Sequence, residues 1–280
     1  MSSKRRPALK RPESVLLIDI GNSRLKWALM LGPYRRGQRF AAKGALELEE
    51  LRGNGSALQR SLARFGPHLR IQACNVAGAA VERQLRGIVR RAGLRPPQFV
   101  RSTRAAAGVR NGYAQPWRLG ADRWAALIGA RSEHPGRALC LVAVGTAMTI
   151  DLLDADGKHR GGSIIPGPKL MIESLLEHTA GIRRRAGGRN AADGSRASRA
   201  RLFARDTREA VAAGAVRAAA ALISEAMRTA RVLVGSTPRL ILSGGAADAI
   251  GPLLREPRRR EDELALRGLA VLRSARTQFE

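Results

Sequence analysis

The stretch from Leu16 to Trp27 constrains the fold more than any other part of the chain. An apolar run leads into Asp19, the short segment Gly21-Asn22-Ser23 follows, and apolar and charged residues then alternate. Alternation with a period of two is typical of a β-strand with one buried face. The stretch therefore predicts a β-hairpin whose turn offers backbone N–H groups, a hydroxyl and Lys26 to a phosphate group.

A second stretch, Leu141–Asp151, has the same shape as the first. It is again an apolar strand, a turn of glycine and a hydroxyl residue, and a strand that leads away. Aligning Gly21 with Gly145 places the two turns 124 residues apart (145 minus 21), which is roughly the size of a small domain. The repeat predicts two related halves that close on a nucleotide between two phosphate-binding hairpins.

The length and composition indicate a folded chain of one or two domains. The chain has 280 residues, of which 44% are hydrophobic, so global disorder is excluded. It has no uninterrupted apolar run of about 20 residues, and we therefore expect no membrane span. The two cysteines, Cys74 and Cys140, lie in apolar runs, and we expect both to be buried and reduced. These features favour the cytoplasm.

The net charge of +27 is compatible with several kinds of anionic partner. The basic residues are scattered, and aromatic residues make up only 4% of the chain, so few rings are available to stack on bases. Specific nucleic-acid binding is therefore not favoured, whereas an anionic substrate and loose association with polyanions both fit. Clusters of basic residues occur only at Lys4–Arg6, Arg183–Arg185 and Arg258–Arg260.

Several segments have a clear local pattern. Residues 1–13 are predicted to be a flexible basic tail, and leucines recur at helical spacing between Ala45 and Phe65. Residues 181–201 are rich in Gly and Arg and predict a mobile loop or a poorly formed helix, whereas Thr207–Ala230 predicts a long helix. Residues 154–157 resemble part of a calcium loop but lack its downstream Glu, so they predict a hairpin turn.

Two further turns each allow two interpretations. Asp122 lies where a loop from Asn111 enters an Ala-rich helix, and a carboxylate in the first turn of a helix is favoured by the helix dipole alone. Residues 243–246 follow a buried strand and predict either a tight strand-to-helix turn or a close approach of the backbone to a nucleotide. The four histidines, which have no zinc-ligand spacing, predict surface or local packing positions: His68, His134, His159 and His178.

Taken together and in order, seven blocks of the sequence resemble the type III pantothenate kinases, which belong to the sugar-kinase/Hsp70/actin superfamily. The resemblance extends from about Val15 to Leu272. The blocks are Asp19–Lys26, Gly120–Arg123, Gly145–Asp151, Gly161–Gly167, Phe203–Thr207, Ser243–Ala246 and Leu266–Leu269.

The resemblance implies both a fold and an activity. The fold is α/β, with two similar ribonuclease-H-like (actin-like ATPase) domains at 14–119 and 120–280, each a mixed central sheet flanked by helices. The activity is the ATP-dependent phosphorylation of pantothenate to 4′-phosphopantothenate, the first step of coenzyme A biosynthesis. The resemblance also implies a homodimer, since members of the family are generally homodimers in which the pantothenate site is completed across the interface.

The resemblance also assigns roles to single residues. Asp19 orients Mg²⁺ through water, and Asp122 is the base that accepts the proton of the acceptor hydroxyl. The residues implied to bind the nucleotide are Asp19, Ile20, Gly21, Asn22, Ser23, Arg24, Leu25, Lys26, Thr146, Gly244 and Gly245. Those implied to bind pantothenate are Tyr113, Gly120, Ala121, Asp122, Arg123 and Thr207. Arg123 is expected either to help hold the acid partner or to orient Asp122.

One position departs from the family pattern. Many members have an Asp two residues before the Gly-Thr turn, associated with a monovalent cation such as K⁺ or NH₄⁺, and this chain has Ala143 there. Any such cation would have to bind to backbone carbonyls or other groups. A position in the core of the strand fits Ala143 better.

Two other functions remain open at this point. One is an accessory or regulatory protein on the same fold that influences transcription, with weak or no kinase activity. The presence of Asp19, Lys26, Asp122 and Arg123 argues against it. The other is a kinase of a different small acid or sugar, against which the Gly120–Arg123 block and Tyr113 argue.

Overall fold

The computed structural model describes residues 14–53, 55–65, 67–187 and 201–277. These form two compact units: unit 1 comprises the described residues up to Val100 and those from Leu269 onward, and unit 2 comprises those of Arg101–Gly268. The predicted tail at 1–13 lies outside the described residues, as do residues 188–200 of the predicted loop. The predicted domains, 14–119 and 120–280, follow the two sequence repeats and not these compact units. The boundary between residues 119 and 120 therefore stays a prediction.

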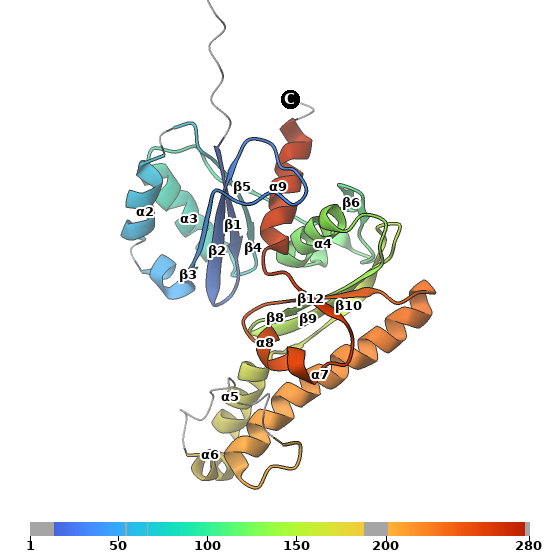
Figure 1. Ribbon diagram of the computed structural model, residues 1–280. Helices are drawn as coiled ribbons and strands as arrows, with labels where there is room; N and C mark the ends of the chain where they lie inside the picture. The colour runs from blue at the N-terminus through green and yellow to red at the C-terminus, as the bar shows by residue number, and fades with distance from the viewer. Residues whose placement is uncertain (1–13, 54, 66, 188–200, 278–280) are drawn as a thin grey trace, which may run out of the picture. The chain divides into compact units, whose positions relative to one another are not determined.

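Unit 1 contains a mixed sheet with the strand order β3-β2-β1-β4-β5 (Figure 1). β1 pairs antiparallel with β2, which pairs antiparallel with β3, whereas β4 runs parallel to β1 and β5 runs parallel to β4. The strands are β1 (Ser14–Ile20), β2 (Arg24–Leu31), β3 (Ala42–Glu47), β4 (Arg70–Asn75) and β5 (Gln98–Phe99).

Unit 2 repeats this topology strand for strand. Its order is β10-β9-β8-β11-β12, with antiparallel pairing in the β8–β9–β10 meander and parallel pairing of β11 with β8 and β12. The strands are β8 (Leu139–Val144), β9 (Ala147–Leu153), β10 (His159–Pro166), β11 (Arg239–Ser243) and β12 (Arg258–Arg260); a short pair, β6 (Ala105–Ala106) and β7 (Val109–Arg110), precedes them. The prediction of two similar mixed sheets flanked by helices is confirmed.

Both faces of the unit 1 sheet are covered. On one face Leu16, Ile18 and Ile20 pack in a core with α1 (Leu48–Arg52), α2 (Ser56–Ala63) and α3 (Ala79–Arg91). On the other face the Gln72 side chain donates a 2.7 Å hydrogen bond to the carbonyl of Leu269 in α9 (Leu264–Thr277). Burial on both faces explains why β1 is apolar almost throughout.

The leucine spacing after Ala45 is typical of a helix, but the first residues of this segment form a strand. Residues 42–47 form the edge strand β3, and the first helix begins only at Leu48. Gly44 makes this pairing possible, because a Cβ atom there would lie 2.8 Å from the ring of Trp27 on β2. The packing of an aromatic side chain across a glycine thus decides the local structure.

In unit 2 the helices cover two faces of the sheet. Figure 1 shows α4 and α7 on opposite faces. Cys140, Val142 and Val144 of β8 belong to the core that contains residues of α5, α7 and α8, so the alternate residues of β8 and β9 face α4. The helices are α4 (Ala121–Glu133), α5 (Pro168–His178), α6 (Ala180–Arg185), α7 (Thr207–Val234) and α8 (Ala247–Ile250), with 3₁₀ turns at Pro116–Arg118 and Gly251–Leu253.

The long helix α7 confirms the prediction made from Thr207 onward. By length and composition it is also apolar enough to cross a bilayer. Its residues Val216, Ala219 and Ile223 are buried in the core of unit 2, as is usual for the central helix of a folded domain.

Two smaller predictions are also confirmed. Residues 154–157 form the turn between β9 and β10, where the Asp154 carboxylate accepts hydrogen bonds from the backbone N–H groups of Asp156 and Lys158. Cys74 and Cys140 are both free and buried.

Candidate active site

The predicted phosphate turn of unit 1 connects β1 to β2. The N–H of Gly21 donates to the carbonyl of Arg24 over 3.0 Å, which closes the turn and leaves Asn22 and Ser23 exposed. Ile20 and Leu25 are buried in the core, so only their backbone atoms can face a ligand. Arg24 forms an exposed ion pair of 2.9 Å with Glu47 on β3.

Asp19 and Lys26 are directly opposite each other on β1 and β2. Residues paired in this way point to the same face of a sheet, with Cβ atoms about 5 Å apart. Cys74 lies on β4, which pairs with the other edge of β1. Its thiol donates to the Asp19 carboxylate with an Sγ–Oδ1 distance of 3.2 Å. A carboxylate and an ammonium group thus lie together beside the glycine turn.

The corresponding turn of unit 2 connects β8 to β9. The N–H of Gly145 donates to the carbonyl of Ala147, and the N–H of Gly167 donates to that of Thr146. A Cβ atom on Gly167 would lie 2.1 Å from the Gly145 carbonyl oxygen, so only glycine fits there. Ala143 lies in β8 as expected, but its methyl group is exposed, and the core position expected for it is wrong.

Gly244 and Gly245 follow β11 and turn the chain back against β8. Gly244 has a φ of +93°, and a Cβ atom there would lie 2.4 Å from the Val144 carbonyl oxygen. Its N–H donates to Asp262, and its carbonyl accepts from Arg260 over 2.7 Å. The tight turn therefore has a structural reason of its own, whether or not it also binds a nucleotide.

Asp122 occupies the first turn of α4, as the sequence predicts. One carboxylate oxygen accepts a 2.7 Å hydrogen bond from the backbone N–H of Arg123. Burial raises the pKa of Asp122 above its ordinary value, and this hydrogen bond opposes the shift only in part. The loop before the helix is held by Ser102, whose hydroxyl donates to the Leu119 carbonyl.

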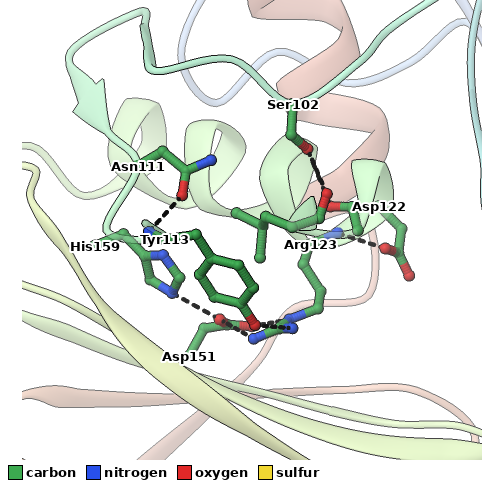
Figure 2. Close-up of polar contacts among 9 residues, drawn as sticks. Ser102, Asn111, Tyr113, Asp122, Arg123, Asp151 and His159 are labelled. Carbon is green, nitrogen blue, oxygen red and sulfur yellow. Dashed lines mark hydrogen bonds and ion pairs between the residues drawn. The ribbon is translucent and has the colours of Figure 1, made fainter. Parts of the chain in front are cut away.

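The side chain of Arg123 turns away from Asp122 and into the protein (Figure 2). Its Nε and Nη2 atoms donate to both oxygens of Asp151, at 2.8 and 2.6 Å, and Nη1 donates to the Tyr113 hydroxyl at 2.9 Å. The guanidinium therefore binds Asp151 rather than Asp122. Only the backbone N–H of Arg123 orients Asp122.

Asp151 lies on β9, on the sheet face toward α4, and shares its charge between two partners. Besides Arg123, it binds Nε2 of His159, which is fully buried, over 2.8 Å. Burial alone would raise the pKa of Asp151, but the hydrogen bonds from His159 and Arg123 outweigh it and hold the pKa below its ordinary value. The carboxylate is therefore ionised at neutral pH, and it raises the pKa of Arg123 against the opposite effect of burial.

Tyr113 completes this network of side chains. Its ring stacks on the His159 ring with centroids 5.8 Å apart and an interplanar angle of 17°. Its backbone N–H donates to the Asn111 side chain (Figure 2). The strand β10 can approach because position 162 is glycine: a Cβ atom there would lie 2.7 Å from both Arg123 Nη2 and Asp151 Oδ1.

Thr207 does not belong to this group of residues. It is the first residue of α7, after Asp206, whose side chain caps the helix by accepting from the N–H of Glu209. Figure 1 shows that α7 begins beside α6, at the end of unit 2 remote from α4. Within one copy of unit 2, the structure brings Tyr113 and Gly120–Arg123 together but leaves Thr207 apart.

Sequence reasoning missed the roles of Asp151 and His159. The prediction of local packing for His159 is confirmed, but its carboxylate partner was not foreseen. One signal was available: Asp151 is a single acidic residue in an apolar strand, and a buried carboxylate needs a cationic or hydrogen-bonding partner.

The profile of the family described as type III pantothenate kinase matches residues 15–229 of this chain. The chain is 40% identical over 261 residues to a type III pantothenate kinase of Burkholderia thailandensis, and the alignment covers 92% of this chain and 96% of that protein.

Solved structures show the same fold at low sequence identity. A protein named for the Baf family of transcriptional activators, from Campylobacter jejuni, superimposes with a TM-score of 0.55 at 18% identity and covers 94% of this chain and 99% of its own. MreB5 of Spiroplasma citri bound to AMPPNP gives a TM-score of 0.53 at 10% identity, covering 97% and 98%. At these identities the likeness concerns the fold alone, which is that of the actin-like ATPases and sugar kinases.

Proposed function

This chain belongs to the type III pantothenate kinase family, and from that premise we propose which of its residues carry out the reaction. The enzyme transfers a phosphoryl group from ATP to pantothenate, in the first step of coenzyme A biosynthesis. An accessory protein that influences transcription is not favoured, because the chain is 40% identical to a pantothenate kinase over almost its whole length. Phosphoryl transfer depends mainly on positioning the reactants and on neutralising the charge of the phosphates.

We propose that Asp122 is the general base. The observation that carries this assignment is its carboxylate, which is oriented by the Arg123 N–H and has no cationic side chain hydrogen-bonded to it among the described residues. A carboxylate whose pKa is raised by burial accepts a proton more readily than an exposed one. Its position at the start of a helix with a fixed entry loop keeps it in one orientation.

The pantothenate site is proposed at Tyr113 and Gly120–Arg123. A guanidinium has five N–H donors, of which Arg123 uses three on Asp151 and Tyr113. The remaining two, together with the Tyr113 O–H, suit the carboxylate and hydroxyl groups of pantothenate. Because Asp151 already neutralises most of the Arg123 charge, selection for the substrate carboxylate depends more on hydrogen-bond geometry than on net charge.

For ATP we propose the Gly21–Ser23 turn and Lys26 in unit 1 and Thr146 in unit 2 as phosphate contacts, with Gly244 and Gly245 on the adenosine side. Asp19 fits Mg²⁺ held through water. No group of three or more potential metal ligands occurs within the described ranges, and Mg²⁺ is commonly held by one or two carboxylates, phosphates and several waters. Mg²⁺ would neutralise charge on the transferred phosphoryl group.

The site expected for K⁺ or NH₄⁺ lacks its usual carboxylate in this chain. The position expected to supply a carboxylate is Ala143, whose methyl group is exposed on β8. Any monovalent cation here would rely on backbone carbonyls or other groups, without the negative charge that a carboxylate at position 143 would supply. We therefore expect K⁺ to change turnover only slightly.

A homodimer is proposed from the position of Thr207. If Thr207 contacts pantothenate, it does so from a second copy, because α7 begins far from α4 in its own copy. An active site completed by the partner explains how residues so distant within one chain share a substrate. We further propose that the enzyme acts in the cytoplasm, in keeping with its two reduced cysteines, and that it binds no specific nucleic acid.

The test of this function is an ADP-release assay coupled to a reporter enzyme. We expect ADP release that requires pantothenate and Mg²⁺, with turnover changing less than twofold when K⁺ replaces Na⁺. Omission of pantothenate measures the background ATPase rate. Equal ADP release with and without pantothenate contradicts the kinase assignment, and a strict K⁺ requirement contradicts the inference from Ala143.

A further inference from the structure

A cavity of about 840 Å³ lies at the end of the unit 2 sheet that is opposite to the phosphate turns. Ala138 and Arg239, at the starts of the parallel strands β8 and β11, line it. Gly145 and Gly244 follow the other ends of these strands. A strand of this length spans about 17–20 Å at about 3.3 Å per residue, so the cavity is separate from the ATP contacts that we propose in unit 2.

The lining of this cavity is strongly basic. Its charged residues are one glutamate, Glu256, and the six arginines Arg137, Arg231, Arg239, Arg255, Arg258 and Arg259. Arginines come from the C-terminal part of α7, the loop before β8, and β12 with the loop that precedes it. The Arg258–Arg259 pair belongs to a basic cluster noted in the sequence, to which the kinase reaction gives no role.

Four of these six arginines have no acidic partner among the residues that the structure describes. Some arginines elsewhere in unit 2 pair with nearby carboxylates: Arg160 with Asp154, Arg228 with Glu225, and Arg260 with Asp248 and Asp262. In the part of the chain that the structure describes, Arg137, Arg231, Arg255 and Arg259 form no ion pair and no side-chain hydrogen bond.

The other charged groups of the lining also leave the charge uncompensated. Arg239 contacts the His134 ring at 3.2 Å, and Arg258 donates to the Leu254 carbonyl. The carboxylate of Glu256 accepts from the Ser224 hydroxyl. Four arginines without an ion pair among the described residues therefore line one concavity together with a single carboxylate.

The chemistry of this cavity matches a small, multiply charged anion. Planar guanidinium groups bind phosphate oxygens in a bidentate manner, and repulsion between neighbouring guanidinium groups falls when an anion lies between them. The volume is within the range of small-molecule sites, about 300–1,000 Å³. The lining has no aromatic ring, which disfavours a single-stranded nucleic acid stacked on it.

We propose that this cavity, which we call the arginine cavity, binds a small ligand with two or more phosphate groups at a site distinct from the kinase site. Arginines from α7, from the loop before β8 and from β12 supply its contacts. The ligand is a di- or triphosphate compound that is bound and not consumed there. Binding needs no kinase activity, so the proposal does not depend on the catalytic assignment.

The test uses inorganic tripolyphosphate as the probe and the full-length protein. Isothermal titration calorimetry compares wild type with R231Q/R259Q and with the control R184Q/R185Q, which removes the same charge from exposed positions of α6. We expect the dissociation constant to rise at least tenfold in R231Q/R259Q and less than twofold in the control. Kinase turnover without tripolyphosphate is expected to be unchanged in both.

Hydrogen–deuterium exchange locates the binding and separates it from the phosphate turns. Tripolyphosphate is expected to slow exchange in residues 228–240 and 254–261 of the wild type, and not in R231Q/R259Q. R137Q/R255Q provides a second variant from the same cavity with the same expected loss. Equal weakening in the control, or protection confined to residues 19–26 and 144–148, overturns the proposal and assigns the binding to bulk charge or to the ATP contacts.

Discussion

Arg123 binds Asp151 through two parallel hydrogen bonds, with Nε 2.8 Å from one carboxylate oxygen and Nη2 2.6 Å from the other. Both side chains are buried, with exposed fractions of 7% and 5%. The pair joins the first turn of α4, which carries Asp122, to the middle of β9. The residue that we propose as the general base therefore lies next to an arginine that is held by a buried charge pair.

Replacing Asp151 with Asn should destabilise the fold and weaken pantothenate binding. Removing one partner of a buried ion pair leaves the other charge uncompensated, at a cost of about 3–5 kcal/mol. We expect this loss in urea unfolding at pH 7, together with a raised KM for pantothenate. Because the folded-state pKa of Asp151 is lowered, its contribution exists above the ordinary carboxyl pKa and is lost as the pH falls through the folded value.

The control for Asp151→Asn is Glu225→Gln, which breaks the exposed pair with Arg228. Exposed pairs contribute little to stability, so its unfolding midpoint should equal that of the wild type. Equal midpoints for Asp151→Asn and the wild type would show that the buried pair does not stabilise α4.

Replacing Asp122 with Asn should abolish most turnover without unfolding the protein. General-base catalysis contributes about 10²–10⁴-fold, and steady-state ADP release should fall by that factor with little change in the KM for ATP. Asp156→Asn, in the exposed turn between β9 and β10, is the matched control and should retain full turnover. An Asp122→Asn enzyme with wild-type turnover would require a different base.

The pH dependence of the reaction should reflect the environment of Asp122. Burial raises the pKa of this carboxyl above its ordinary value of 3.8, so kcat/KM for pantothenate should fall, as the pH decreases, at a higher pH than an exposed Asp would give. The same shift means that ionised Asp122 opposes folding above the folded-state pKa, an effect absent below the unfolded value. Asp122→Asn should therefore melt at a higher temperature than the wild type at pH 7, with the difference shrinking toward pH 4.

Replacing Gly162 with Ala should disturb the site without changing any charge. The added methyl group would lie 2.1 Å from the Ile150 carbonyl oxygen and 2.7 Å from Arg123 Nη2, so β10 must move away. We expect a lower melting temperature and a raised KM for pantothenate. Gly181→Ala, where the added atom meets nothing within 4 Å, should leave both unchanged; identical behaviour of the two variants would exclude close packing at Gly162.

Mixing two inactive variants tests whether Thr207 acts across a dimer. If each site takes Asp122 from one copy and Thr207 from the other, half of a randomly mixed population is heterodimer with one intact site. Co-refolded Asp122→Asn and Thr207→Ala should then recover about a quarter of wild-type turnover. A mixture no more active than the average of its two components would place Thr207 in the site of its own chain or outside any site.

The sequence predicts the strands and turns well because their signals are local. Period-two alternation from Leu25 onward, and glycine at 21 and 145, are properties of neighbouring residues, and the structure has a hairpin at each place. The start of the Ala45–Phe65 segment differs because the Trp27 ring, from another strand, lies across Gly44. That contact is not visible in the local pattern.

The network around Asp122 could be predicted only in part, for the same physical reason. The position of Asp122 in the first turn of a helix follows from residues 120–133 alone. The turn of Arg123 toward Asp151 depends on which face of β9 packs on α4, and the burial of His159 depends on the register of β10. Both depend on tertiary packing. In the local sequence the one sign of them was Asp151, a single acidic residue in an apolar strand.

The matching strand order of the two sheets is the pattern that duplication of one ancestral sheet would produce. Position 143 corresponds to position 19, yet only the first copy kept the carboxylate. When a protein has two similar sheets, one of them can lack a functional side chain that the other still supplies. In this chain the first half has the acidic strand end and the second half has the helix that carries Asp122, while both rest on the same order of strands.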